Sequence, residues 1–187
     1  MMGSPQSLSE IDRRIVASWA ADCAERVLAV FESESPADPR PRDAIARTRA
    51  FARGELDAAG EIRRRFVAGR AAHDVATPPA IAAARAAAQA AGVAHMGAHA
   101  LGAAAYAAKA AGLSGPDHVD AVRDEIRWQL EQLSPEARTA LRQLPLLGED
   151  TAGPLGPGLL SRGVLATNIH AIQAGLGSPP RSGTLED

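Results

Sequence analysis

Apolar positions in the first part of the chain recur at helical spacing. From Ile11 to Phe31, hydrophobic side chains follow one another every three or four residues, which is typical of an amphipathic helix. Ser9 stands just before this stripe, and the acidic Asp12 three residues later completes a pattern typical of a helix N-terminus. Because proline cannot continue a helix, we predict a first helix from about Ser9 to just before Pro36.

Two more helices are predicted before the alanine-rich part of the chain. Asp38 can cap a second helix that has proline in its first turn, and Gly54 supplies its end. A third helix is expected from about Asp57 to Val75. Its inward-facing positions are expected to be the apolar ones: Ile62, Phe66, Val67 and Ala71. Its solvent-facing positions are expected to carry a run of arginines: Arg63, Arg64 and Arg65.

The stretch that follows is unusually rich in alanine, with 18 alanines among the 30 residues 82–111. Alanine is the best helix former, and its small side chain lets neighbouring helices approach closely. Thr77 followed by two prolines marks a helix start, and Gly112 marks a helix end. We therefore predict a helix from Pro78 to Ala111 through the centre of a bundle, with Gly92 as the point where it can break.

Two shorter helices are predicted after the alanine-rich stretch. The turn at Ser114-Gly115-Pro116 leads into a fifth helix. The apolar stripe of this helix recurs every three or four residues: Val119, Val122, Ile126, Leu130 and Leu133. A sixth helix begins at Ser134 and Pro135 and ends near Leu144. Because no stretch alternates apolar and polar residues as a β-strand does, the pattern predicts an all-α fold.

The predicted organisation places one helical bundle between two flexible ends. Residues 9–147 are expected to form a single bundle of about six helices with the alanine-rich helix at its centre. Residues 1–8 are expected to be a disordered N-terminus. Residues 148–187 are rich in glycine and proline and are expected to form a flexible tail, in which residues 164–176 can form one short helix.

Composition and charge narrow the classes of function. A net charge of −2 with only 3% aromatic residues gives no sign of binding to nucleic acid or to a membrane surface. The single cysteine, Cys23, excludes an intramolecular disulfide and suits the cytoplasm. No signal peptide is recognisable, and polar or charged side chains interrupt the alanine-rich stretch too often for a membrane span. We therefore expect a cytoplasmic protein.

Six residues are candidates for chemistry because they are polar or reactive and lie in otherwise apolar helices: Asp22, Cys23, His73, His95, His99 and Tyr106. His95 and His99 are four positions apart, so on one helix they share a face, about 6 Å from each other. Together with His73 they could bind a divalent metal such as Zn or Fe. The alternatives are core histidines hydrogen-bonded to Asp22, to Tyr106 or to the backbone, or acid–base groups of a ligand pocket.

The two neighbouring candidates on the first helix each have two interpretations. Cys23 lies on the apolar stripe, where it is either a small buried hydrophobic residue or, with a histidine within reach, a nucleophile. Asp22 borders the same stripe, and a buried carboxylate needs a cationic partner. The partners considered for it are Arg40, Arg49 and His99.

Other polar and aromatic residues are expected to be structural. Asp38 and Arg40 are expected to fix the loop before the second helix, and Trp19 and Trp128 to anchor the core. The chain contains no phosphate-binding glycine loop, no dinucleotide fingerprint, no G-x-S-x-G and no C-x-x-C. The common enzyme classes therefore have no positive support, and a non-enzyme is favoured.

Several segments together resemble a known family. They are Trp19 to Phe31, Asp38-Pro39-Arg40-Pro41-Arg42, Ala71-Ala72-His73, His95 with His99, Ala103 to Lys109, and Trp128-Gln129-Leu130-Glu131. In this order they resemble the bacterial immunity proteins of the immunity-protein-5-like group, over about residues 9–143. Phe51 stands where this group is expected to have tryptophan. The resemblance implies an all-helical protein that neutralises a toxin.

Two hypotheses of function follow, from different classes. The first is a protein that binds a toxin stoichiometrically and covers or distorts the active site of that toxin. Its contact surface is expected on the arginine-bearing face of the second and third helices or on the acidic face of the fifth. The second is an enzyme, or a small-molecule or metal-binding protein, that uses the six polar candidates. A homodimer formed through the alanine-rich helix is a further alternative.

Overall fold

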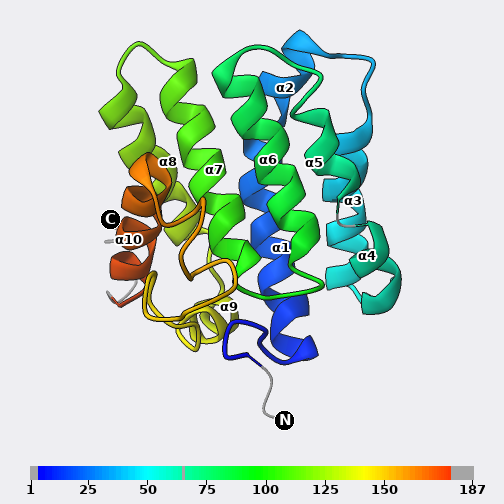
Figure 1. Ribbon diagram of the computed structural model, residues 1–187, viewed down its shortest axis with the longest axis vertical. Helices are drawn as coiled ribbons and strands as arrows, with labels where there is room; N and C mark the ends of the chain where they lie inside the picture. Colours follow the sequence, from blue (N-terminus) through cyan, green and yellow to red (C-terminus); the bar gives the residue numbers. More distant parts are fainter. Residues whose placement is uncertain (1–3, 65, 178–187) are drawn as a thin grey trace, which may run out of the picture.

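Every regular element that the computed structural model contains within its described residues, 4–64 and 66–177, is an α-helix. The helices are, in chain order, α1 (Glu10–Arg26), α2 (Leu28–Glu34), α3 (Arg40–Ala52), α4 (Ala58–Arg64), α5 (Val67–Ala71), α6 (Pro78–Gly92), α7 (His99–Ser114), α8 (His118–Glu131), α9 (Pro135–Leu141) and α10 (Gly163–Gly177). The longer ones stand side by side as a bundle (Figure 1). The all-α prediction is confirmed, although the described residues form more helical segments than the six or so predicted.

The α6–α7 pair forms the core of the bundle. These two neighbouring helices run in opposite directions (Figure 1), and most of their alanines are fully buried. The alanine-rich region is two helices rather than one, because the chain turns at residues 93–98. The break occurs at Gly92, as predicted, where an added Cβ would lie only 2.9 Å from Cγ of His99.

The end of α7 differs from the prediction. The helix continues past Gly112 to Ser114. Gly112 instead permits the close approach of α8, because an added Cβ there would lie 2.5 Å from Cγ2 of Val122. Since the alanines of α7 lie inside the bundle, a homodimer through this helix would require the bundle to open. No helix in the described part of the chain has the length and apolar character needed to cross a membrane.

Helix α1 begins at the predicted cap, Ser9, whereas the N-cap of α3 is Pro39 and the predicted Asp38 stands one residue before it. The backbone N–H of Asp12 donates to Oγ of Ser9 at 3.0 Å and starts α1. The backbone N–H of Arg40 donates to the carboxylate of Asp38 at 3.0 Å and starts α3. Gly54, just after α3, has a φ of 80°, a backbone conformation that favours glycine. The predicted first helix is nevertheless split into α1 and α2.

The prediction of one continuous third helix is wrong, and so is part of the inward face predicted for it. This segment forms two short helices, α4 and α5, and the interruption between them changes which residues face the core. The side chains of Phe66 and Val67, predicted to point inward, are 61% and 39% exposed. Ala71 is buried as predicted, and Ala68, which was not predicted, is buried beside it. These small side chains allow α5 to lie close to α6.

Helix α8 follows the prediction except at its start and near its end. Val119, predicted to belong to the apolar stripe, is 75% exposed in the first turn of α8. Trp19 on α1 is buried, as predicted for a core anchor. Trp128, predicted to have the same role, is only half-buried, and the guanidinium of Arg26 lies over its ring at 4.2 Å.

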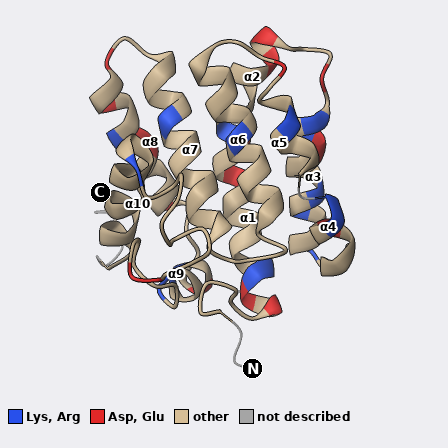
Figure 2. Cartoon of the chain, in the orientation of Figure 1, with Lys and Arg blue, Asp and Glu red and all other residues tan. Residues whose placement is uncertain are grey.

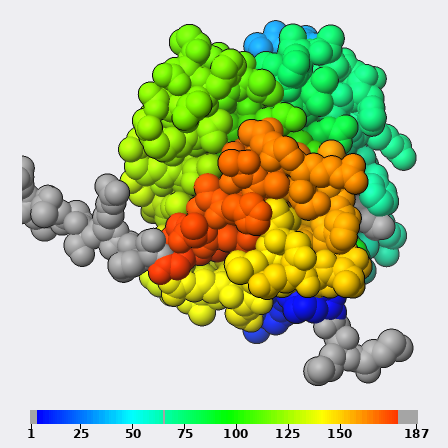
Figure 3. All heavy atoms as spheres, turned by 60° about the vertical axis from the view of Figure 1, so that its left-hand side comes forward, coloured from blue at the N-terminus to red at the C-terminus, as the bar shows by residue number. Residues whose placement is uncertain are grey.

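The chain after residue 147 is packed on the bundle up to residue 177, which contradicts the predicted flexible tail (Figure 3). Helix α10 lies against α7 and α8, and the apolar side chains of the segment are buried: Leu155, Leu160, Leu165, Ile169, Ile172 and Leu176. The fully buried Gln6, predicted to be disordered, donates to the Ala152 carbonyl at 2.6 Å and accepts the Leu155 N–H at 2.9 Å. Burial of these apolar side chains therefore holds the segment in place, although its glycine and proline content favours a flexible chain. Residues 178–187 lie outside the described part.

Replacing Ile169 with alanine tests this packing. Ile169 is fully buried on α10, so the variant should lose about 2–5 kcal/mol of unfolding free energy through lost contacts and the cavity left behind. The matched control is Val164→Ala on the same helix, where the side chain is 44% exposed and the loss should stay under about 0.5 kcal/mol. Urea denaturation measures both. Equal, small losses would show that α10 does not belong to the cooperative core.

Candidate partner-binding surface

The six residues predicted as candidates for chemistry lie in separate environments. Asp22 is half-buried on α1 and forms an ion pair with Arg49 at 2.6 Å, one of the three partners considered for it. His73 and His95 are exposed. His95 lies in the turn after α6 and His99 begins α7, so the prediction that they share one helix face is wrong. Within the described residues, no three His, Cys, Asp or Glu side chains are placed to hold a metal ion.

The remaining candidates are held by packing and hydrogen bonds. Cys23 is fully buried, and burial, with the nearby negative charge of Glu125, raises the pKa of its thiol well above the ordinary value. This disfavours the thiolate that a nucleophile requires. Tyr106 is 3% exposed, and burial raises the pKa of its hydroxyl against the opposing charge and hydrogen bond of Arg85. Nδ1 of His99 lies 2.8 Å from the side-chain oxygen of Gln89.

A buried polar network that the sequence reasoning missed joins α1, α7 and α8. Glu125 is 5% exposed, and its carboxylate accepts hydrogen bonds from Nε of Arg26 at 2.7 Å and from Nε2 of Gln129 at 3.1 Å. The side-chain amide of Gln129 also donates to the Ala104 carbonyl at 3.1 Å, while the backbone carbonyl of Gln129 accepts the indole N–H of Trp19 at 2.7 Å. The four-residue spacing of Glu125 and Gln129 beside the apolar stripe of α8 was the available signal. These contacts join the three helices, and the Arg26 side chain, 43% exposed, lies at the edge of the network.

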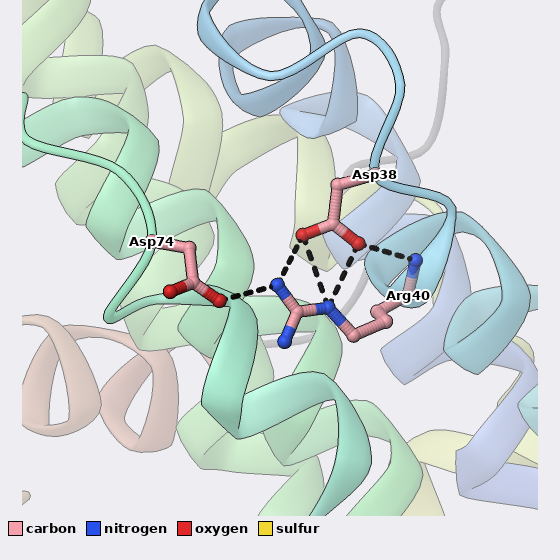
Figure 4. Close-up of polar contacts among 3 residues, drawn as sticks. All are labelled: Asp38, Arg40 and Asp74. Carbon is pink, nitrogen blue, oxygen red and sulfur yellow. Dashed lines mark hydrogen bonds and ion pairs between the residues drawn. The ribbon is translucent and has the colours of Figure 1, made fainter.

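A charged cluster fixes the loop before α3, as predicted for Asp38 and Arg40. Nε of Arg40 donates to both carboxylate oxygens of Asp38, at 2.8 and 3.0 Å, and Nη2 donates to Asp74 at 2.6 Å (Figure 4). The hydrogen bonds from Arg40 lower the pKa of Asp38, and the two carboxylates raise the pKa of Arg40. Because Asp74 follows α5, the cluster ties the start of α3 to the end of α5.

Beside this cluster lies a surface that carries both arginines and exposed apolar side chains. We call it the α4–α5 surface and define it by five exposed residues: Arg63, Arg64, Phe66, Val67 and Arg70. In Figure 2, the ribbons of α3, α4 and α5 carry several blue segments, which mark Lys and Arg positions. Arg63 and Arg64 are exposed as predicted, whereas the third arginine of the predicted run, Arg65, lies outside the described residues.

A small hollow adjoins the α4–α5 surface. Arg64 and Val67 line it from that surface, and its volume is about 50 Å³. Its charged walls are completed by two arginines and two acidic residues: Arg40, Arg47, Asp43 and Glu61. Both added arginines are held in place, Arg40 by the cluster of Figure 4 and Arg47 by Glu61, whose carboxylate accepts Nε of Arg47 at 3.1 Å. The hollow is therefore a preformed, arginine-lined recess beside exposed apolar side chains.

Replacing Asp38 with asparagine tests the cluster. Asparagine keeps an oxygen that can accept the backbone N–H of Arg40 but removes the charge, so the unfolding free energy at pH 7 should fall by about 1–2 kcal/mol. Because the pKa of Asp38 is lower in the folded protein than its ordinary value of 3.8, its stabilisation is complete above that value and is lost as pH falls through the folded pKa. The difference between wild type and variant should therefore close below pH 3.8.

The control is Asp74→Asn, because the Asp74 side chain is 60% exposed and its pairing should contribute under about 0.5 kcal/mol. Denaturant titrations at several pH values measure both variants. An Asp38→Asn protein as stable as wild type at pH 7 would show that other contacts hold this loop.

No curated protein and no solved structure matches the chain. The profile of one protein family matches residues 6–136, which span α1 to α8 and the start of α9 and include every residue of the α4–α5 surface. On this match, the chain belongs to the family described as "Imm-5 like putative immunity protein".

Proposed function

We propose that this protein neutralises a bacterial toxin by binding it stoichiometrically in the cytoplasm. The observation that carries the proposal is the family match over residues 6–136, because immunity proteins protect a cell by binding. Neutralisation would then need a stable surface that covers or distorts the active site of the toxin. It would need no chemistry from the immunity protein itself.

The geometry supports binding over catalysis. The groups that could act as nucleophile or acid–base pair are separated: Cys23 is buried, His95 is exposed in a turn and His99 is hydrogen-bonded to Gln89. The hollow beside the α4–α5 surface holds about 50 Å³, well below the roughly 300 Å³ of a small-molecule site. A larger hollow of about 350 Å³ contains none of the six polar candidates, because its lining residues are Ile11, Arg14, Ile15, Ser18, Ala52 and Arg53. Exposed arginine and aromatic side chains are instead the types that dominate protein interfaces.

The test is protection by co-expression. The full chain is expressed with the toxin-like product of the gene beside it, and growth is compared with cells that express the toxin alone. We expect restored growth, and native mass spectrometry of the purified pair should show one copy of each protein. A catalytically dead toxin variant serves as the control for toxicity.

Two outcomes would contradict the proposal. If no neighbouring gene product binds this protein, a role in neutralisation by binding fails. If the protein purified without a metal column retains a stoichiometric metal or small molecule that is lost in a variant with both His95 and His99 replaced by alanine, the enzyme or ligand-binding alternative is favoured.

A further inference from the structure

We propose that the α4–α5 surface is where the toxin binds, and that the toxin presents there a carboxylate-rich patch with an apolar centre. This inference rests on the proposed function, because it names the contact surface and the chemistry of the partner. The sequence leaves two contact surfaces open, the arginine-bearing face of the second and third predicted helices and the acidic face of the fifth, which is α8. The inference selects the first of these.

The first argument is unbalanced charge. Residues 58–71 contain four arginines and one acidic residue. That acidic residue, Glu61, is already bound to Arg47. Among the described residues, Arg63, Arg64 and Arg70 have no ion-pair partner. Exposed guanidiniums without a carboxylate partner attract acidic partners and can bind a carboxylate with two parallel hydrogen bonds.

Most charges of the acidic face of α8 are already paired. Arg123 pairs with Asp120 and Arg127 with Asp124, and among the described residues Glu131 is the exposed carboxylate of this helix without an ion pair. Its buried carboxylate, Glu125, is bound to Arg26. Binding a basic partner there would have to break existing ion pairs, whereas binding an acidic partner at the α4–α5 surface forms new ones.

The second argument is the apolar centre of the surface. Phe66 is 61% exposed and the next residue, Val67, is 39% exposed, so two neighbouring apolar side chains are exposed together. Arginines flank these two positions in the sequence. A central aromatic residue surrounded by charged groups is the usual arrangement of an interface hot spot.

The third argument is the adjoining hollow. About 50 Å³ is space for one or two water-sized groups, which suits the tip of one partner side chain. Three arginines line it against two acidic residues, Asp43 and Glu61, and Glu61 is bound to Arg47. Because Arg40 and Arg47 are held by ion pairs, a carboxylate entering beside Arg64 would meet preoriented cationic groups.

The experiment uses the full chain and two synthetic peptides of equal length. One carries a Leu-Phe centre flanked by glutamates, and the other carries the same centre flanked by lysines. Fluorescence anisotropy measures binding, and backbone amide chemical shifts locate it. We expect the acidic peptide to bind at the α4–α5 surface, to weaken as salt rises, and to bind much more tightly than the basic peptide.

Two sets of variants test the same surface in the peptide assay and with the toxin. The double variant R63E/R64E should weaken binding by about 30-fold, and F66A by about 10-fold. R162E is the matched charge control, because Arg162 is exposed and has no ion-pair partner in the described part of the chain. L159A is the matched apolar control, because Leu159 is 61% exposed, like Phe66. Both controls should change binding by less than about twofold.

The outcomes separate the inference from the proposed function. If the toxin is neutralised and binds R63E/R64E as tightly as wild type, the inference is overturned and the proposed function stands. If no toxin is found, the proposed function fails, and the peptides alone decide on the surface. An acidic peptide that does not bind, or whose amide shifts map to α8, overturns the inference.

Discussion

The close packing of two alanine-rich helices is the constraint on which the rest of this structure depends. Small side chains let α6 and α7 lie against each other and against several neighbours at once. Each buried alanine contributes little apolar area, so most of the stabilisation by burial must come from larger side chains around this pair. The largest fully buried ones come from the surrounding elements as well as from α7: Phe31, Phe51, Ile45, Leu101, Leu141, Leu155, Ile169 and Ile172.

Polar contacts then decide how the surrounding helices are oriented on this pair. The network of Glu125 and Gln129 joins α8 to α1 and α7 inside the bundle. The cluster of Asp38, Arg40 and Asp74 joins α3 to the end of α5 at its edge (Figure 4). Segments that carry the family resemblance supply residues to both sets of contacts. Their evident role in this structure is to hold the helices in place rather than to bind a ligand.

This division of roles has a consequence for function. The arginines near the hollow are of two kinds, because Arg40 and Arg47 are bound within the protein whereas Arg64 is exposed and has no ion-pair partner among the described residues. A surface of this kind combines a rigid base with groups that can still form new contacts. Such preorganisation lowers the entropic cost of binding a partner, which suits an immunity-type protein better than a catalyst.

The sequence by itself determined the all-α class, the cap at Ser9, the role of Asp38 in the loop before α3, the break at Gly92 and the burial of the alanine-rich helices. These features depend on local propensity and on hydrogen bonds between near neighbours, which a single sequence displays directly. The pairing of Asp22 with Arg49 was among the alternatives considered, but only the packed structure selects it.

Tertiary structure alone decided the rest. Helical spacing predicted that Phe66 points inward, but the interruption between α4 and α5 changes the register and leaves this side chain exposed. In the same way, the turn between α6 and α7 separates His95 from His99. The glycine- and proline-rich segment after residue 147 has weak local preferences, yet its leucines and isoleucines are buried on the bundle. Burial against distant residues outweighs local composition in these places, and no pattern of nearby residues records those distant contacts.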